Sequence, residues 1–343
     1  MAGTLFGYPF NEELFDYNWK QAPNPVTTAI IESGVMQHND EIAALIQPHG
    51  SHLYTIPFYN KLGGTVQNYD GNTDVTFDET TGAFQQGVVW GRMKGWEARD
   101  FIKDHNSNAD PMGSIVRQCA TWWDEYHQTQ ILAMLTALFG VTGTGDIYDA
   151  WAEHTLDISA TGSTVAESNL IGESTVEDAC VKACGDLAQG KFALAMMNSV
   201  VANRLAKLQL LEYRKYTDPQ GIERQLPIAD INGKTVLVSD QLTATGSGDA
   251  KKYTTYVLGT GFIQYADAPV SHPVEGVRDP VTKGGYDKLI MRERRSMHPN
   301  GFSFVPPETD KQSLPDDELF APARWKPVFD PKTIGAARIV TNG

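Results

Sequence analysis

The sequence predicts an α+β protein. Two long helical patterns, one beginning at Pro111 and one near Ser174, interrupt a chain that elsewhere shows the short alternating or apolar runs typical of strands. Glycine and proline are spread along the chain, and no unit repeats at a period of about 20 to 50 residues. These features indicate a mixed globular fold with many loops and argue against a solenoid, a propeller or a fibrous protein.

The composition is that of a globular protein with an acidic surface. Of the 343 residues, 41% are hydrophobic and 20% charged, which suffices for one or two cores. The net charge of -14 argues against general nucleic-acid binding, because neutralising phosphates needs a basic surface. The longest apolar stretch, residues 131–141, is shorter than the roughly 18 residues that a membrane-spanning helix needs, and the N-terminus lacks a secretory pattern. We therefore expect no membrane partner and no export.

The first 95 residues indicate an arm followed by a long β excursion. Residues 1–49 are aromatic and punctuated by proline, with one short amphipathic helix at 42–46 that Pro48 ends. Strands are predicted where apolar residues alternate at 54–58 and 75–77, with turns at Gly63-Gly64 and Asp70-Gly71, and the apolar run at 88–90 suggests another strand. This excursion carries too few apolar residues for a core of its own, so it must pack against something else.

The strongest helix signal begins at Asp110-Pro111, an N-cap acceptor followed by a proline at the first helical position. Apolar residues then recur at helical spacing from Ile115 to Leu138, until Gly140 and Gly143 end the pattern. A helix of some 30 residues would be about 45 Å long.

The second half predicts helix, strand, helix and then further strands. Ser174 and Glu177 have capping-box spacing at the start of a helix that Gly190 ends. A buried strand is expected at 192–197, and Asn198-Ser199 can cap a helix that reaches Leu208. Further strands are expected at 235–238, 253–258 and 289–292. The chain then passes through an acidic, proline-rich stretch and returns to structured sequence at 334–340.

No motif in the sequence predicts a catalytic, cofactor or metal site. Cys180 and Cys184 lie on the apolar face of their helix, which favours buried thiols over a reactive pair, and the odd third residue, Cys119, also suits free thiols. His49 and His52 lack an evident third metal ligand. The 259–261 Gly-Thr-Gly turn lacks the helix that a nucleotide site needs, and no phosphate-binding loop or nucleophile elbow is present. Trp122, Trp123 and Tyr126 suit helix packing better than a ligand platform.

The densest basic segment allows three interpretations. It contains Arg292, Arg294 and Arg295, preceded by Lys288. These side chains could be solvated at a strand edge, contact DNA, or pair with carboxylates of a neighbouring copy. The acidic residues near the tip of the β excursion are the natural candidates for such pairing. The predicted contacts between copies are therefore Asp70, Asp74, Asp78, Glu79, Arg292, Arg294 and Arg295.

Six stretches, in this order and spacing, resemble the Hong Kong 97-type capsid proteins of tailed phages, in particular the gp13-like major capsid protein branch. The resemblance covers nearly the full length of the chain. The stretches are IESGVM (31–36), IPFYNKLGG (56–64), DPMGSI (110–115), INGKTVLVSD (231–240), HPNGFSF (298–304) and the terminal TNG (341–343).

This resemblance implies a non-enzymatic shell subunit with a known division into parts. The N-terminal arm would be residues 1–49, the extended loop 50–95, the peripheral domain 96–145 with 266–343, and the axial domain 146–265. Copies would form hexamers and pentamers that close into an icosahedral head around double-stranded DNA, which is enclosed without sequence-specific binding. Scaffold protein and portal would be separate chains, and assembly would take place in the host cytoplasm.

Some members of the family crosslink their subunits through Lys and Asn. Lys61 lies in the loop region, but no acceptor or catalytic acid is evident, so we expect no crosslinks. Two alternatives remain at this stage: an encapsulin-like nanocompartment shell, which would keep the fold, and an enzyme of unrecognised α+β fold, which would need a convergent polar site.

Overall fold

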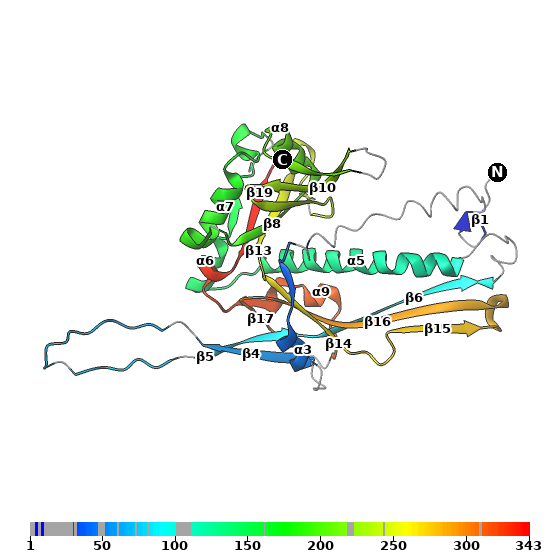
Figure 1. Cartoon of the computed structure of the whole chain (residues 1–343), viewed down its shortest axis with the longest axis horizontal. Coiled ribbons are helices and arrows are strands. Elements are labelled where there is room, and N and C mark those ends of the chain that lie inside the picture. The colour runs from blue at the N-terminus through cyan, green and yellow to red at the C-terminus, as the bar shows by residue number, and fades with distance from the viewer. Residues whose placement is uncertain are drawn as a thin grey trace.

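The computed structural model describes residues 4–5, 8–9, 30, 33–46, 52–59, 62–72, 74–80, 82–100, 111–160, 162, 164–188, 190–217, 223–242, 244–308 and 311–343. One long helix, α5 (Pro111–Leu138), runs through the middle of the molecule (Figure 1). An eight-stranded sheet with its own helices lies at the C-terminal end of α5, and a five-stranded sheet runs along the side of α5. A hairpin extends from the same region into a long projecting loop.

The eight-stranded sheet has the order β7-β19-β13-β8-β11-β10-β9, with β12 paired to β13. Two pairs are parallel, β8 with β11 and β7 with β19, and the other pairs are antiparallel. The strands are β7 (Thr155–Asp157), β8 (Phe192–Met197), β9 (Glu212–Thr217), β10 (Glu223–Ile231), β11 (Lys234–Val238), β12 (Ala244–Thr245), β13 (Lys252–Gly259) and β19 (Ala336–Thr341).

Helices α7 (Thr175–Cys184) and α8 (Ser199–Lys207) pack on this sheet and share a core with it. The short helix α6 (Asp146–Ala152) precedes it, and three single turns, η1 (Glu167–Asn169), η2 (Gly185–Ala188) and η3 (Gly248–Ala250), connect its elements. Although residues 266–343 are expected in the peripheral domain, β19 returns from that segment and pairs with β13 and β7. The domain boundaries stay a prediction.

The five-stranded sheet is built around its longest strand, β16 (Tyr286–Pro299). β6 (Trp90–Arg99) pairs with residues 286–295 along one edge of β16. On the other edge, β15 (Val274–Asp279) pairs with residues 286–291 and β14 (Ile263–Ala268) with residues 294–299. β3 (Met36–His38) adds to β14 in parallel and leads into α3 (Asp40–Ile46). A turn η4 (Thr282–Gly284) joins β15 to β16.

The remaining elements are short and join these layers. β4 (Leu53–Tyr59) and β5 (Gly82–Val88) form the hairpin, and β17 (Phe302–Phe304) pairs with β18 (Trp325–Pro327). Between β17 and β19 lie α9 (Asp316–Leu319), η5 (Pro322–Arg324) and η6 (Pro331–Thr333). β1 (Thr4–Leu5) pairs with β2 (Tyr8–Pro9). No helix in the described part of the chain is long and apolar enough to cross a membrane.

Most of the predicted elements are confirmed. α5 begins at Pro111 and ends at Leu138, just before Gly140, while the expected cap Asp110 lies outside the described residues. β8 is buried almost throughout, and the Asn198 side chain accepts a hydrogen bond of 3.1 Å from the Val200 N–H, which confirms the cap of α8. The short helix predicted at 42–46 is α3.

Three local predictions are wrong. Ser174 precedes α7, but no capping box forms: its hydroxyl donates to Asp178 at 2.7 Å, and Glu177 instead pairs with Lys234 of β11. The described residues 74–80 form no strand, because their side chains have no layer to pack against. No turn forms at Gly63-Gly64, although Gly64 has a positive φ of 115°, whereas the bend at residues 70–72 is present.

A charged network fixes β6 and α9 to α5. The Arg92 Nε donates to the Tyr126 hydroxyl at 2.9 Å and to the Asp316 carboxylate at 3.1 Å, and the Tyr126 hydroxyl donates to the same carboxylate at 2.6 Å. Burial alone would raise the pKa of Asp316, but the hydrogen bonds from Tyr126 and Arg92 outweigh burial and hold that pKa below its usual value. The network therefore keeps a carboxylate charged where sheet and helix meet.

Asp316→Ala should destabilise the subunit by about 1 to 2 kcal/mol. The change leaves the largely buried Arg92 guanidinium without its carboxylate, and the partial exposure of Asp316 limits the cost. Urea unfolding at neutral pH measures the effect. Asp317→Ala removes an exposed carboxylate from the same turn of α9 and is the control, for which we expect a change below about 0.5 kcal/mol. Equal effects of the two changes would contradict the proposed role of the network.

Candidate assembly surfaces

The projecting loop begins where the β4–β5 ladder ends, at the pair Tyr59 and Gly82. Beyond this pair the described residues between 62 and 80 run out and back as extended chain (Figure 1). Side chains rather than a backbone ladder connect the two sides: the Thr76 N–H donates to Gln67 Oε1 at 2.9 Å, and Gln67 Nε2 donates to the Thr76 hydroxyl. The loop thus has no stabilising layer within its own subunit.

The apolar side chains of this loop are exposed to solvent. Each of them is at least 70% exposed, and they comprise Leu62, Val66, Tyr69, Val75 and Phe77. Tyr59 at the root of the loop is 83% exposed. A large exposed apolar surface in a soluble protein marks a contact site. The loop is therefore a candidate contact surface.

The same loop carries only negative charge. Asp70, Asp74, Asp78 and Glu79 lie between residues 62 and 80, and no Lys or Arg does. Asp70 accepts the N–H of Asn72 at 2.9 Å, and Asp78 lies against Gly64. Asp74 and Glu79 have no hydrogen-bond or ion-pair partner among the described residues, so their carboxylates face solvent.

Because successive residues of a strand face opposite sides of the sheet, the three arginines predicted as contacts do not all lie on one face. Arg292 pairs with Glu275 at 3.0 Å on one face of β16, whereas Arg295 pairs with Asp267 at 2.6 Å on the other. Arg294 is exposed and has no charged partner among the described residues. Pairing across subunits stays a prediction for all three. The positive charge of Arg294 is not paired with a carboxylate in the described part of the subunit.

A buried polar seam anchors the hairpin at the root of the loop. The Tyr54 hydroxyl of β4 and the Ser296 hydroxyl of β16 lie 2.7 Å apart. His298 Nε2 of β16 lies 2.8 Å from Gln85 Oε1 of β5, and all four residues are buried. Gly87 leaves room for the Tyr54 ring, since a Cβ there would lie 2.1 Å from Tyr54 Cζ. This seam fixes the direction in which the loop leaves the subunit.

Acid should loosen this seam. Burial lowers the pKa of His298 to about 4, so the ring is neutral in the folded subunit, whereas a His in the unfolded chain has a pKa of about 6.5. Below about pH 6.5 the His298 ring is protonated in the unfolded chain but stays neutral in the folded subunit. Stability should fall by up to about 1.4 kcal/mol per pH unit towards pH 4.

Urea unfolding at pH 7 and pH 5 measures this dependence. His298→Gln should reduce the pH slope, whereas His272→Gln, which changes an exposed ring, should leave it unchanged. An unaltered slope in His298→Gln would show that other groups carry the acid sensitivity.

The residues that suggested chemistry serve packing instead. Cys180 and Cys184 are buried, and burial raises the pKa of both thiols, that of Cys180 to about 12. The Gly-Thr-Gly turn leads into strand β14, not into a helix. Trp122 stacks on Tyr126 and meets Trp96 of β6 edge-on. Among the described residues no group of three or more His, Cys, Asp or Glu could hold a metal ion, and His49 lies outside that part of the chain.

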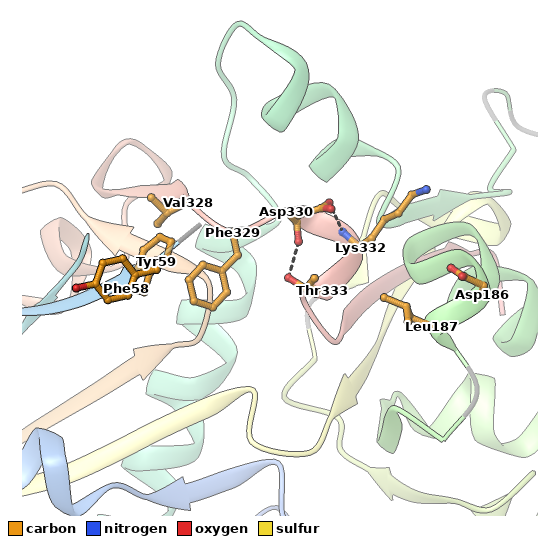
Figure 2. A pocket seen from close by; sticks show the side chains of 9 residues that line it. All are labelled: Phe58, Tyr59, Asp186, Leu187, Val328, Phe329, Asp330, Lys332 and Thr333. Atoms are coloured by element: carbon orange, nitrogen blue, oxygen red, sulfur yellow. Dashed lines mark hydrogen bonds between the residues drawn. The ribbon is translucent and has the colours of Figure 1, made fainter. Parts of the chain in front are cut away.

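A pocket of about 610 Å³ lies near the root of the loop, where the hairpin approaches η2 and η6 (Figure 2). Phe58, Tyr59 and Phe329 form one wall, and Leu187 lies at the opposite side. The Asp330 carboxylate accepts the N–H of Lys332 at 3.2 Å, and the Asp330 carbonyl accepts the Thr333 hydroxyl at 2.7 Å. The polar groups here stabilise their own turn.

Sequence comparison gives one informative relative. No protein-family model matches the chain. The major capsid protein of Bacillus phage SPP1 is 28% identical over 309 residues, which are 90% of this chain and 89% of that protein. A match over nearly the full length of both chains means that their elements correspond in order.

The fold agrees with this relative. The capsid of Ralstonia phage GP4 superposes with a TM-score of 0.56 at 10% identity, covering 90% of this chain and 87% of that chain. The capsid of cyanophage Pam1 gives a TM-score of 0.53 at 12% identity and covers 86% of each chain. By sequence this chain is similar to a phage major capsid protein, and its fold is that of tailed-phage capsid proteins. These similarities support a structural role and favour neither the nanocompartment nor the enzyme alternative.

The Hong Kong 97-type fold is confirmed, whereas the gp13-like branch stays a prediction. Sequence reasoning identified the loop and its acidic residues. It missed the exposed apolar set of the loop, because the alternation at Val75 and Phe77 was interpreted as a strand. It also missed the hairpin seam, for which the isolated polar residues Gln85 and His298 gave no signal.

Proposed function

We propose that copies of this capsid protein assemble as hexamers and pentamers into the icosahedral head of a tailed phage or prophage, with each projecting loop lying on a neighbouring copy. One observation carries this proposal: the loop exposes five apolar side chains that the subunit itself does not cover. A segment that exchanges contacts from subunit to subunit generates rings when the rotation closes.

The division of labour within the subunit is proposed on the same basis. Residues 1–49 would be the arm, 50–95 the extended loop, 96–145 with most of 266–343 the peripheral domain, and 146–265 together with β19 the axial domain. The eight-stranded sheet would then lie near the centre of each capsomer. α5 would connect it to the five-stranded sheet, which runs outward along the helix (Figure 1).

The expected binding partners follow from the net charge of the chain and from the proposed shell function. A chain with a net charge of -14 repels phosphate at long range, so it would enclose packaged double-stranded DNA without binding it tightly or specifically. Scaffold protein and portal would be separate chains, with assembly in the host cytoplasm. Strong DNA binding by purified shells at physiological salt would contradict this part of the proposal.

Limited proteolysis before and after assembly tests the role of the loop. In the free subunit, chymotrypsin should cut at Tyr69 and Phe77, because both side chains are exposed on extended chain. In assembled particles the same sites should be protected by the neighbouring copy. Cleavage at equal rates in both forms would contradict the proposal, and Tyr256, which is buried, provides an internal control site.

A further inference from the structure

Asparagine followed by glycine is a dipeptide at which a protein chain can modify itself. Glycine has no Cβ, so nothing hinders its backbone nitrogen from attacking the side-chain amide carbon of the preceding asparagine. The sequence contains three such pairs, which begin at Asn232, Asn300 and Asn342, and all three lie within the described residues. Because the reacting groups are the same in each pair, differences in their reactivity must come from the fold.

The fold protects Asn342 by holding both ends of its side-chain amide. Its Oδ1 accepts the Ala160 N–H at 2.7 Å, and its Nδ2 donates to the Lys251 carbonyl at 3.0 Å. The residue is also buried. The amide must therefore break two hydrogen bonds before it can turn towards the Gly343 nitrogen.

The fold protects Asn300 through the nitrogen that would attack it. Gly301 is buried, and its N–H donates to Gln85 Oε1 at 3.3 Å. Gln85 belongs to the buried seam at the root of the hairpin, where the same oxygen lies 2.8 Å from His298 Nε2. A Cβ on Gly301 would lie 2.9 Å from Ile334 Cγ1, so the surroundings are closely packed. The Gly301 nitrogen cannot move without breaking this seam.

Asn232 lacks both kinds of protection in the described structure. With Gly233 it forms the two-residue turn between β10 and β11, whose last ladder pair is Ile231 with Lys234. Both turn residues are exposed. Their φ values of 48° and 75° are positive, as a type I′ turn requires, and Asn-Gly is a favoured sequence for that turn. The Gly233 N–H has no hydrogen-bond acceptor among the described residues.

The Asn232 side chain makes a single weak hydrogen bond in the part of the chain that the structure describes. Its Nδ2 lies 3.5 Å from Glu177 Oε1 in the first turn of α7, and that carboxylate already pairs with Lys234 Nζ. A hydrogen bond of this length on an exposed side chain contributes little. The amide carbon is therefore open to the Gly233 nitrogen whenever the turn relaxes, and to water afterwards.

We propose that Asn232 is a site of spontaneous modification, at which the folded subunit converts asparagine to aspartate and isoaspartate. The Gly233 nitrogen attacks Asn232 Cγ: the N–Cγ bond forms, the Cγ–Nδ2 bond breaks, and the proton of the Gly233 nitrogen leaves with the amide as ammonia. Water then opens the cyclic imide at one of its two carbonyls, and solvent water is the only co-reactant. Opening at the main-chain carbonyl gives isoaspartate, and opening at Cγ gives aspartate.

Either product changes the surroundings of Lys234. The new carboxylate would lie beside Glu177, so that the Lys234 ammonium, whose side chain is 9% exposed, would face two carboxylates. Isoaspartate also lengthens the backbone of the turn. Because a two-residue turn fixes the register of its strands, we expect isoaspartate to loosen the β10–β11 ladder. The reaction depends only on this turn and is independent of the proposed shell function.

Peptide mapping of aged protein tests the proposal. The full-length subunit is incubated at mildly alkaline pH in water enriched in heavy oxygen, which labels each opened imide, and is then digested in ordinary water. Trypsin releases the three asparagines on separate peptides, residues 225–234, 296–311 and 339–343. The first peptide should gain label at least tenfold faster than the other two, because local opening costs less at an exposed turn than in a buried seam.

The same incubation in guanidinium chloride is the control. In the unfolded chain Asn300 should react within about threefold of the rate of Asn232, because only the fold distinguishes the two pairs. Asn232→Gln should lose the label from residues 225–234, since the longer side chain closes an imide ring far more slowly. Equal rates at Asn232 and Asn300 in the folded subunit would overturn the proposal. So would the absence of label at Asn232 while the unfolded chain reacts.

Discussion

Deleting residues 65–80 should leave a folded subunit that no longer forms stable shells. The deletion starts beyond the last pair of the β4–β5 ladder, Tyr59 with Gly82, so the hairpin keeps its strands and its buried seam. It removes four of the five exposed apolar side chains and all four carboxylates of the loop. The subunit loses no core residue, whereas the shell loses the contact that joins neighbouring copies.

Two measurements check this result. Circular dichroism and urea unfolding should match those of the full-length subunit within about 0.5 kcal/mol, since surface changes away from the core have small effects. Sedimentation should show no particles. Gln67→Ser combined with Thr76→Ser is a control that keeps the apolar side chains and should still assemble. Global unfolding of the deletion variant would show that the loop belongs to the core, and normal shells would show that it makes no essential contact.

Trp151→Ala should destabilise the subunit by about 3 to 5 kcal/mol. Trp151 is 2% exposed and lies where α6 meets the end of α5 and β17. Its ring stacks on Phe139 at 5.1 Å and on His154 at 4.6 Å, and it meets Phe302 edge-on at 4.8 Å. Its Nε1 donates to the Leu138 carbonyl at 3.0 Å, which also accepts the Val141 N–H at 3.3 Å at the end of the helix. Removing the ring creates a cavity and takes away one of the two hydrogen bonds that the Leu138 carbonyl accepts.

Trp151→Phe is the matched control for this change. Phenylalanine keeps most of the stacking but cannot donate to Leu138, so it should lose roughly 1 to 2 kcal/mol. Urea unfolding of the two variants separates packing from hydrogen bonding. If Trp151→Ala lost less than about 1 kcal/mol, the aromatic cluster would not be the joint between the long helix and the eight-stranded sheet.

The helices and strands that could be predicted from the sequence are those that depend on residues close together in the chain. The proline at the start of α5, the asparagine that caps α8 and the apolar run of β8 each act within a few residues, so they could be read without knowing the fold. The capping box at Ser174 failed for a tertiary reason: the Glu177 carboxylate that would close it pairs with Lys234 from β11. A cap is a weak preference, and a charged partner from another element can displace it.

The candidate surfaces show the same division between local and long-range information. Acidic residues clustered in one loop were visible in the sequence. The different roles of Arg292, Arg294 and Arg295 were not, because only strand pairing reveals that Glu275 and Asp267 neutralise two of them.

Electron microscopy of the purified protein, produced alone and together with the proposed scaffold protein, tests the central claim most directly. The account predicts closed shells of regular size, or hexamers and pentamers on the way to them, with the projecting loop of each subunit lying on its neighbour. A product that stays strictly monomeric under both conditions, with intact fold by circular dichroism, would contradict it.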